Sequence, residues 1–314
     1  MPDISPSLLL KELSHAIRET KSERRKVRLQ SELENLKVLV KTWRDAGECY
    51  YPGCSSKSIE HSHTVQRAAL AKRLGNQVRT PVWGGEAFAI QRRSAKSLST
   101  FPGYCPQHEG IFTFENTGVF SDRRDDVLQM MRTIHREQWL NDKKIEFLGR
   151  FNRATEADED GRAPGLDATS ESRNNMVRTL ESMKIRIDAL ERVLSDSIAN
   201  GTSIPQGLVI GADIDLLPFS FHAAVELNET LRPLIAVSLV FAGGQSRVIT
   251  AIEPDFEECN VAYWSQFLAT DSKRLKTFDE WIKFGTFDWY ASEQWWASKS
   301  KDEQSKLEGY VNKV

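Results

Sequence analysis

Cysteine is scarce in this chain, with four among 314 residues, and no apolar run reaches the roughly 18 residues that a membrane-spanning helix needs. The first residues also lack the charged-then-apolar order of a secretory signal peptide. So few cysteines in so long a chain do not indicate a disulfide framework, which leaves metal binding as the better use for closely spaced pairs. We therefore expect a cytoplasmic protein in a reducing compartment, without membrane association.

Signatures of several enzyme classes are missing as well. The sequence has no phosphate-binding Walker loop, no G-x-G-x-x-G after a strand and no G-x-S-x-G nucleophile elbow. Lys and Arg number 42 against 44 Asp and Glu, which gives a net charge of −2. This balance excludes a wholly basic nucleic-acid-binding coat but allows a local basic patch.

Residues 1–46 are rich in Leu, Lys, Glu and Arg, with no Gly or Pro after Pro6. Apolar side chains recur at alternating steps of four and three, at Leu29, Leu33, Leu36, Val40 and Trp43. This period predicts one long amphipathic helix, or two in tandem, with a coiled-coil-like seam.

Residues 121–200 predict a second helical region, which begins with a polar helix over 122–151. Residues 152–173 are acidic and almost without large apolar side chains, so they cannot recover their ordering entropy by burial and are expected to be a mobile linker. A second four-three seam follows at Met176, Leu180, Met183, Ile187, Leu190 and Leu194. It predicts pairing with the N-terminal helix or with a second copy of the chain.

Residues 201–314 predict an antiparallel sheet. β-Branched, partly alternating runs begin near residues 207, 221, 234 and 246, and the turn-like residues 242–245 join the last two. The rest of the segment is rich in Trp and Phe and is expected to form helices that cover one face of the sheet, where the aromatic side chains serve core packing. The chain is therefore expected to be an α+β protein.

Residues 47–120 hold two closely spaced pairs of potential metal ligands, Cys49 with Cys54 and Cys105 with His108. Zinc prefers thiolate and imidazole ligands in a tetrahedron, and two ligands a few residues apart can bind it from a tight turn. Each residue alone could be an ordinary thiol or a surface imidazole, but together they predict a structural Zn²⁺ site of the treble-clef type. Cys259 stands alone and is expected to be a small buried side chain.

The order of these elements resembles HNH-type nucleases of the His-Me finger superfamily: a first cysteine pair, a strand that ends at His63, and a second ligand pair that opens a helix. The resemblance implies that His63, or in second place His61, is the general base that activates water against a phosphodiester. It also implies a catalytic Mg²⁺ or Mn²⁺ bound through oxygen by Glu109 with Glu115 or Asn116.

The sequence departs from that family in three respects. The interval between His63 and Cys105 is long, the first pair is C-x4-C in place of C-x2-C, and no His follows Glu109 at the family's spacing. His63 could instead cap a helix that starts at Thr64, or bind zinc in place of His108, in a finger that does not cleave.

A locally basic segment lies between the two ligand pairs. From residue 64 to residue 104 the sole acidic residue is Glu86. Phosphate contacts from basic side chains would supply nucleic-acid affinity, and the expected contacts are Arg67, Arg73, Arg92, Arg93 and Lys96. The alternative is a solvated surface that is rich in Arg.

These patterns favour a zinc-stabilised, HNH-like, metal-dependent nuclease that hydrolyses DNA or RNA. Residues 47–120 also resemble poorly characterised bacterial proteins with HNH-like domains, which implies a role as an effector of anti-phage defence. The alternative is a non-catalytic zinc-binding protein that binds nucleic acid or a protein partner. Its helical seams would then bind the partner or a second copy of the chain.

Overall fold

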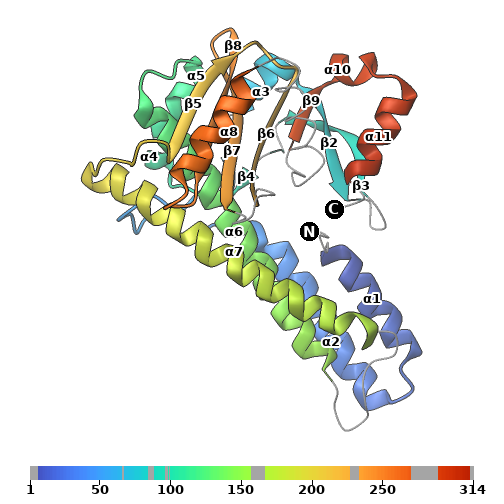
Figure 1. The fold of residues 1–314 in the computed structure, drawn as a ribbon. Helices are drawn as coiled ribbons and strands as arrows, with labels where there is room; N and C mark the ends of the chain where they lie inside the picture. The colour runs from blue at the N-terminus through green and yellow to red at the C-terminus, as the bar shows by residue number, and fades with distance from the viewer. Residues whose placement is uncertain are drawn as a thin grey trace. The chain divides into compact units, whose positions relative to one another are not determined.

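A computed structural model describes residues 6–65, 67–83, 88–95, 98, 100–156, 167–226, 233–269 and 289–311. The chain divides into two compact units, each described here by itself (Figure 1). The first unit contains residues 46–137 and 186–314, and the second contains residues 2–45 and 138–185. Within the described ranges, no helix is both long enough and apolar enough to cross a membrane.

The N-terminal segment forms two helices in tandem, α1 (Pro6–Glu19) and α2 (Glu23–Lys41). Ser22 is the N-cap of α2, because its side chain accepts a hydrogen bond from the backbone N–H of Arg25. The second helix therefore begins directly after it. A short 3-10 turn (Thr42–Arg44) follows α2. Among the described residues of this segment, the helical prediction therefore holds in its two-helix form.

The second unit buries the apolar side of α1 and α2 against parts of α6 (Arg123–Thr155) and α7 (Asp167–Asn200). Asn141 of α6 donates to the backbone carbonyl of Leu180 on α7 at 2.8 Å. The cluster buried between these helices includes Leu9, Leu13, Leu29, Leu33, Leu36, Phe147, Phe151 and Leu180. Residues of both predicted seams are thus buried inside one chain.

The predicted linker at 152–173 is wrong at both ends, because α6 continues to Thr155 and α7 begins at Asp167. The two helices contact each other there. Arg173 donates from Nε to Oδ1 of Asn152 at 3.1 Å, and its guanidinium lies 5.1 Å from the ring centroid of Phe151. These side-chain contacts order the ends of the segment, although its composition offers few apolar residues for burial. Residues 157–166 lie outside the described part.

The first unit is built on a seven-stranded antiparallel sheet with strand order β3-β2-β9-β6-β7-β8-β5 (Figure 1). The strands are β2 (Gln77–Trp83), β3 (Phe88–Ser94), β5 (Val209–Ile214), β6 (Phe219–Glu226), β7 (Leu234–Ala242), β8 (Gln245–Ile252) and β9 (Trp289–Ser292). The antiparallel prediction is confirmed for the C-terminal part, including the tight turn that pairs Ala242 with Gln245.

This sheet also joins two segments that are predicted as separate domains. Strands β2 and β3 come from the predicted zinc-binding segment 47–120, yet β2 pairs with β9 through Val78 opposite Ser292 and Arg79 opposite Ala291. Segment 47–120 and the C-terminal segment 201–314 therefore share one sheet.

One face of the sheet forms the apolar core of the first unit. Ile235, Val237, Leu239, Val248 and Ile252 pack there with aromatic and aliphatic side chains from three helices, α8 (Glu257–Ala269), α10 (Glu293–Ser298) and α11 (Lys301–Val311). Among the tryptophans in this core, Trp264 and Trp296 lie on helices as predicted, whereas Trp289 lies on β9. Leu275, Phe278, Trp281 and Ile282 lie outside the described residues.

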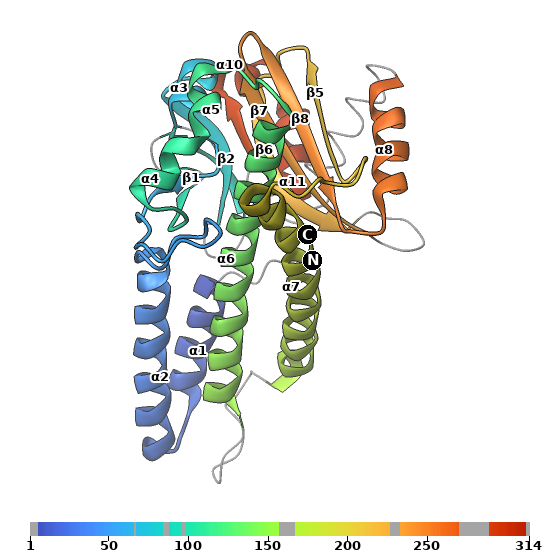
Figure 2. The ribbon, with the colours of Figure 1, turned by 90° about the vertical axis from the view of Figure 1, so that its left-hand side faces the viewer.

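The other face of the sheet is polar where it meets the first turns of α6. Gln129 of α6 donates to the hydroxyl of Ser238 on β7 at 3.1 Å. Arg247 of β8 binds both carboxylate oxygens of Asp126 on α6, at 2.6 and 2.8 Å. Figure 2 shows α3 and α5 on this side of the sheet and α8 on the opposite side.

The smaller elements of the zinc-binding segment are a two-stranded pair and several short helices. Strand β1 (Ser62–His63) pairs antiparallel with β4 (Thr100–Phe101), and α3 (Arg67–Leu74) follows β1. After β4 come α4 (Pro106–Glu109), a 3-10 turn (Gly110–Phe112) and α5 (Thr113–Thr117). Gly118 ends α5 as its C-cap, with a left-handed φ of 70°.

Candidate metal centre and its neighbours

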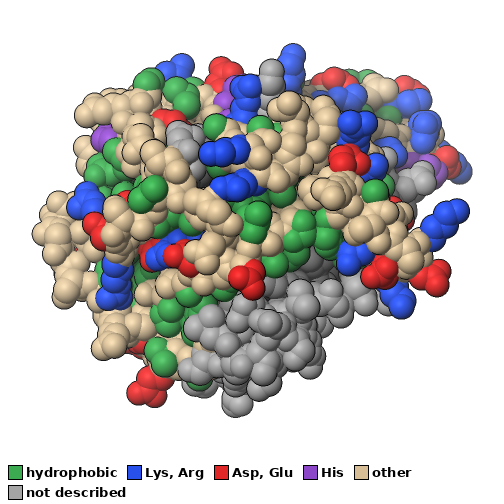
Figure 3. Space-filling model, turned by 90° about the horizontal axis from the view of Figure 1, so that it is seen from above, with side chains coloured by type: hydrophobic (Ala, Val, Ile, Leu, Met, Phe, Trp, Pro, Cys, Tyr) green, Lys and Arg blue, Asp and Glu red, His purple; other side chains and the backbone are tan. Residues whose placement is uncertain are grey.

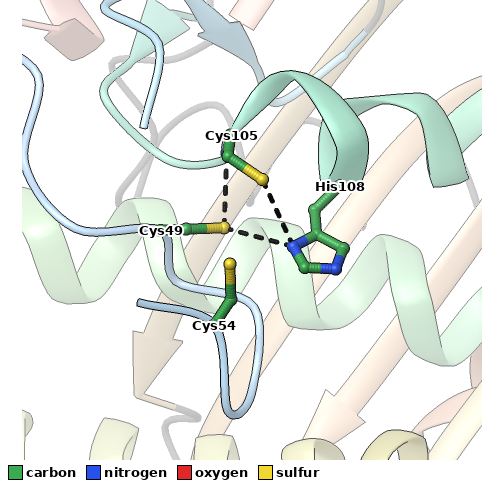
Figure 4. A group of neighbouring side chains, drawn as sticks. All are labelled: Cys49, Cys54, Cys105 and His108. Carbon is green, nitrogen blue, oxygen red and sulfur yellow. Dashed lines mark hydrogen bonds between the residues drawn. The ribbon is translucent and has the colours of Figure 1, made fainter. Parts of the chain in front are cut away.

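Cys49, Cys54, Cys105 and His108 converge on one point, with their ligand atoms all within 4.8 Å of one another (Figure 4). Nδ1 of His108 lies 3.5 Å from Sγ of Cys49 and 3.4 Å from Sγ of Cys105. Zinc bond lengths of about 2.3 Å to sulfur and 2.0–2.1 Å to nitrogen imply a tetrahedral S···N edge of about 3.5 Å. The four side chains therefore fit a metal such as zinc.

A tight turn places the first two ligands. Gly53 adopts a left-handed φ of 73°, which an L side chain rarely takes, and the backbone N–H of Cys54 donates to the carbonyl of Tyr51 at 3.0 Å. The backbone N–H of Cys49 donates to the carbonyl of Ser56 at 2.9 Å. These bonds turn the chain back on itself, so that both sulfurs point to the same side.

The second pair sits at the start of α4, as predicted. Cys105 occupies the N-cap position, and Pro106 follows in the first turn. The backbone N–H of Cys105 donates to Sγ of Cys49 at 3.3 Å, which links the two halves of the site. The ring of Tyr51 stacks on His108 with centroids 3.9 Å apart, so the imidazole is held toward the sulfurs.

Burial raises the pKa of the Cys49 thiol to about 11. A bound cation between the sulfurs would stabilise the thiolate and reverse this effect. Cys259 lies on α8, packs half-buried against the apolar sheet core, and takes no part in the cluster. Three of the four cysteines therefore belong to one site.

His63 lies beside the cluster but is not one of its ligands, since His108 supplies the imidazole. His63 pairs with Thr100 across the β1–β4 ladder, and its Nδ1 lies 3.2 Å from the backbone carbonyl oxygen of Leu98. A carbonyl accepts hydrogen bonds only, so Nδ1 carries the proton. The neutral ring then presents a lone pair at Nε2.

Burial, assisted by the charge of Arg132, favours the neutral form of His63. Burial lowers the pKa of His63 below its ordinary value of 6.5, and the positive charge of Arg132 lowers it further. The negative charge of Glu109 acts in the opposite direction. His61, the second choice for a general base, is an exposed turn residue outside the strand.

Glu109 follows His108 directly and forms an ion pair with Arg132 of α6. The Arg132 side chain is 0% exposed, and its guanidinium lies 4.1 Å from the ring centroid of Phe112. Sequence reasoning missed Arg132, because no local pattern distinguishes it from the other basic residues of the chain. The side chains of Glu115 and Asn116, on α5, lie outside what the structure describes.

A buried hydrogen-bond chain supports the residue before Cys105. The hydroxyl of Tyr104 lies 2.7 Å from Nδ1 of His135 on α6, and Nε2 of His135 lies 3.2 Å from the carboxylate of Glu191 on α7. Both ring nitrogens of His135 are therefore engaged. This chain connects α6 and α7 to the start of α4.

The predicted nucleic-acid contacts are dispersed. Arg67 is exposed on α3 and Arg73 is half-buried there, whereas Arg92 and Arg93 are exposed on β3. Lys96 lies outside the described residues. In the view of Figure 3, Lys and Arg side chains are interspersed with Asp and Glu. The binding surface stays a prediction.

Comparison of the chain with protein-family models, with curated proteins and with solved structures finds no match in any of the three.

Proposed function

We propose that this chain is a zinc-stabilised, HNH-like nuclease in which His63 is the general base. Three features support the resemblance: strand β1 ends at His63, β4 pairs with it antiparallel, and α4 then begins directly after Cys105, one of the proposed metal ligands. The long interval between His63 and Cys105 holds α3, β2 and β3, which leave the β1–β4 pairing intact.

The observation that carries the proposal is the 3.2 Å contact between Nδ1 of His63 and the carbonyl oxygen of Leu98, from which we infer the tautomer. Its Nδ1–H is directed to the Leu98 carbonyl and its ring is neutral, so Nε2 can accept a proton from water. The water oxygen then forms a bond to phosphorus as one proton of the water passes to Nε2. The bond from phosphorus to the leaving oxygen breaks, and the leaving oxygen takes a proton from solvent. Such a base contributes typically 10²–10⁴-fold to a rate.

The zinc has a structural role in this proposal. Four protein ligands leave no open coordination position for water, as is usual in structural zinc sites. Bound metal would fix Cys105 and His108, and through them the start of α4, where Glu109 lies. The site therefore holds the geometry around His63 and takes no part in proton transfer.

A catalytic Mg²⁺ or Mn²⁺ fits the described residues less well. Such an ion prefers carboxylate oxygen, and it would stabilise negative charge on the phosphate. Glu109 is the carboxylate beside His63, yet its Oε1 already binds Arg132, whose positive charge opposes a second cation. We derive no step through this ion, and its requirement is left to experiment.

The same ion pair favours the second candidate function, a non-catalytic zinc-binding protein that binds nucleic acid or a protein partner. In that account Arg132 neutralises Glu109 permanently and the finger is a scaffold. His63 then serves to hold the β1–β4 pair to Leu98.

A cleavage assay with matched variants separates the two functions. Zinc-loaded wild type, His63→Ala and His61→Ala are incubated with plasmid, single-stranded DNA and single-stranded RNA, each with Mg²⁺, with Mn²⁺ and without added divalent ion. We expect cleavage by the wild type and His61→Ala, and a loss of about 100-fold or more in His63→Ala at unchanged zinc content. Intact substrate with zinc-loaded wild type would favour the scaffold.

A further inference from the structure

Two arginine charges act on His63, and they differ in their surroundings. Arg132 is 0% exposed and ion-paired with Glu109, so it cannot reach a ligand from solvent. Arg67 also acts on His63, and it is exposed on the first turn of α3. Arg67 forms no hydrogen bond or ion pair in the described part of the chain. It is therefore an exposed cation that lies four residues after the candidate base in the chain.

The backbone fixes Arg67 relative to His63. Only three residues separate the end of β1 from the start of α3. The carbonyl of Thr64 accepts a hydrogen bond from Nε2 of Gln129 at 3.1 Å, and Val65 is fully buried. On α3, Ala69 and Leu70 are buried, so the helix is anchored by the side opposite solvent. The backbone that carries the exposed Arg67 side chain is therefore held in place.

The arginines of the β2–β3 hairpin are in a different state. Arg79 and Arg92 lie directly opposite each other across the two strands, where two like charges would repel. Glu293 lies between them, at 3.2 Å from Nε of Arg79 and 3.4 Å from Nε of Arg92. Arg93 donates to the side chain of Gln91 on its own strand. The hairpin cations are therefore engaged within the protein.

We propose that Arg67 is the phosphate-binding residue of the His63 site, which holds a nucleic-acid phosphodiester against the base, and that the hairpin arginines lie outside this site. The proposal rests on the proposed nuclease function and names the contact that brings the substrate to it. A guanidinium presents paired N–H donors that match two phosphate oxygens. It also supplies charge without adding an acidic or basic group that would titrate near neutral pH.

Binding and cleavage are measured separately on the full, zinc-loaded chain. Binding of a fluorescein-labelled single-stranded oligonucleotide is followed by anisotropy in Ca²⁺, over a series of salt concentrations, for wild type, Arg67→Ala, Arg67→Lys and the matched control Arg93→Ala. We expect Arg67→Ala to weaken binding about tenfold and to reduce the salt slope by about one. Arg67→Lys recovers part of the affinity, and Arg93→Ala stays within about twofold of wild type.

Equal binding by Arg67→Ala and wild type overturns the proposal, as does an equal loss in Arg93→Ala, which would indicate a diffuse basic surface. Zinc content and thermal unfolding of each variant show whether Arg67→Ala is folded. If Arg67→Ala is not folded, the comparison of Arg67→Lys with wild type decides the test. Selective loss of binding in Arg67→Ala supports the assignment even where the wild type fails to cleave. That failure would count against the nuclease function alone.

Discussion

The guanidinium of Arg132 on α6 binds the carboxylate of Glu109, the residue directly after the metal ligand His108 on α4. The pair is buried on the Arg132 side and lies against the ring of Phe112. It connects the metal centre to the long helix that also packs on the polar face of the sheet. Arg132 lowers the pKa of His63, whereas Glu109 raises it. A change in either residue of the pair therefore affects both the candidate base and the fold.

Removing Arg132 alone should destabilise the protein strongly. Arg132→Met leaves the Glu109 carboxylate without its ion-pair partner in a largely buried place, which typically costs about 3–5 kcal/mol. The double variant with Glu109→Gln should be less destabilised than the two single changes combined. Urea unfolding of the four zinc-loaded proteins measures the coupling. A coupling energy near zero would mean that the pair contributes nothing to stability.

Zinc binding should depend on Cys54 and not on Cys259. Cys54→Ser removes one thiolate of the cluster, whereas Cys259→Ser changes a half-buried thiol on α8. We expect about one zinc per chain in wild type and Cys259→Ser, and a large loss of zinc in Cys54→Ser. Metal analysis by mass spectrometry after dialysis gives the answer. Equal zinc in both variants would refute the proposed ligand set.

Acid should destabilise the first unit through His222. This side chain is 1% exposed on β6, and burial lowers its pKa well below the ordinary value of 6.5, with the charges of Arg136 and Arg132 acting in the same direction. The folded state therefore takes up this proton at a lower pH than the unfolded chain does. Stability is lost as the pH falls below 6.5, by up to about 1.4 kcal/mol per pH unit.

His222→Gln tests this contribution, because it removes the titrating group. The free energy of unfolding should then fall less between pH 7 and pH 5 than it does in wild type. His61→Gln is the matched control, because it replaces an exposed histidine by the same residue type. A parallel pH dependence in all three proteins would show that His222 is not responsible.

A methyl group at Gly211 should lower the free energy of unfolding, although the backbone of Gly211 does not have a positive φ. A Cβ at Gly211 would overlap the carboxylate of Asp126, which cannot move away because Arg247 binds both its oxygens. We expect Gly211→Ala to lower the free energy of unfolding by about 1–3 kcal/mol. Gly244→Ala, where nothing lies within 4 Å, should be nearly neutral in the same denaturation experiment.

Local patterns predicted the Cys/His cluster and the four C-terminal strands β5 to β8 from sequence alone. The spacing from Cys105 to His108 is one turn of a helix start, so both ligands were expected on one side of it, as found. The turn before Gln245 was likewise visible from its glycines. Such features depend on residues a few positions apart, which is the range over which periodicity and turn chemistry carry information.

The features that sequence analysis missed depend on contacts between distant segments. Nothing in residues 77–94 indicates that β2 pairs with β9. The backbone hydrogen bonds of a strand do not depend on a sequence pattern that identifies its partner strand. The pairing of Arg173 with Asn152 extended two helices into a segment whose composition predicts a linker. Arg132 is one of 42 basic residues, and only the fold places it at Glu109 and His63.

Chemical rescue tests the role of His63 most directly. Single-turnover cleavage of a labelled single strand is measured for zinc-loaded wild type and His63→Ala, with and without added imidazole. If His63 is the general base, His63→Ala is inactive and free imidazole restores part of the cleavage in proportion to its concentration, with no effect on the wild type. A wild type that leaves the strand intact, or a His63→Ala variant that cleaves as fast as wild type, would contradict the proposed function.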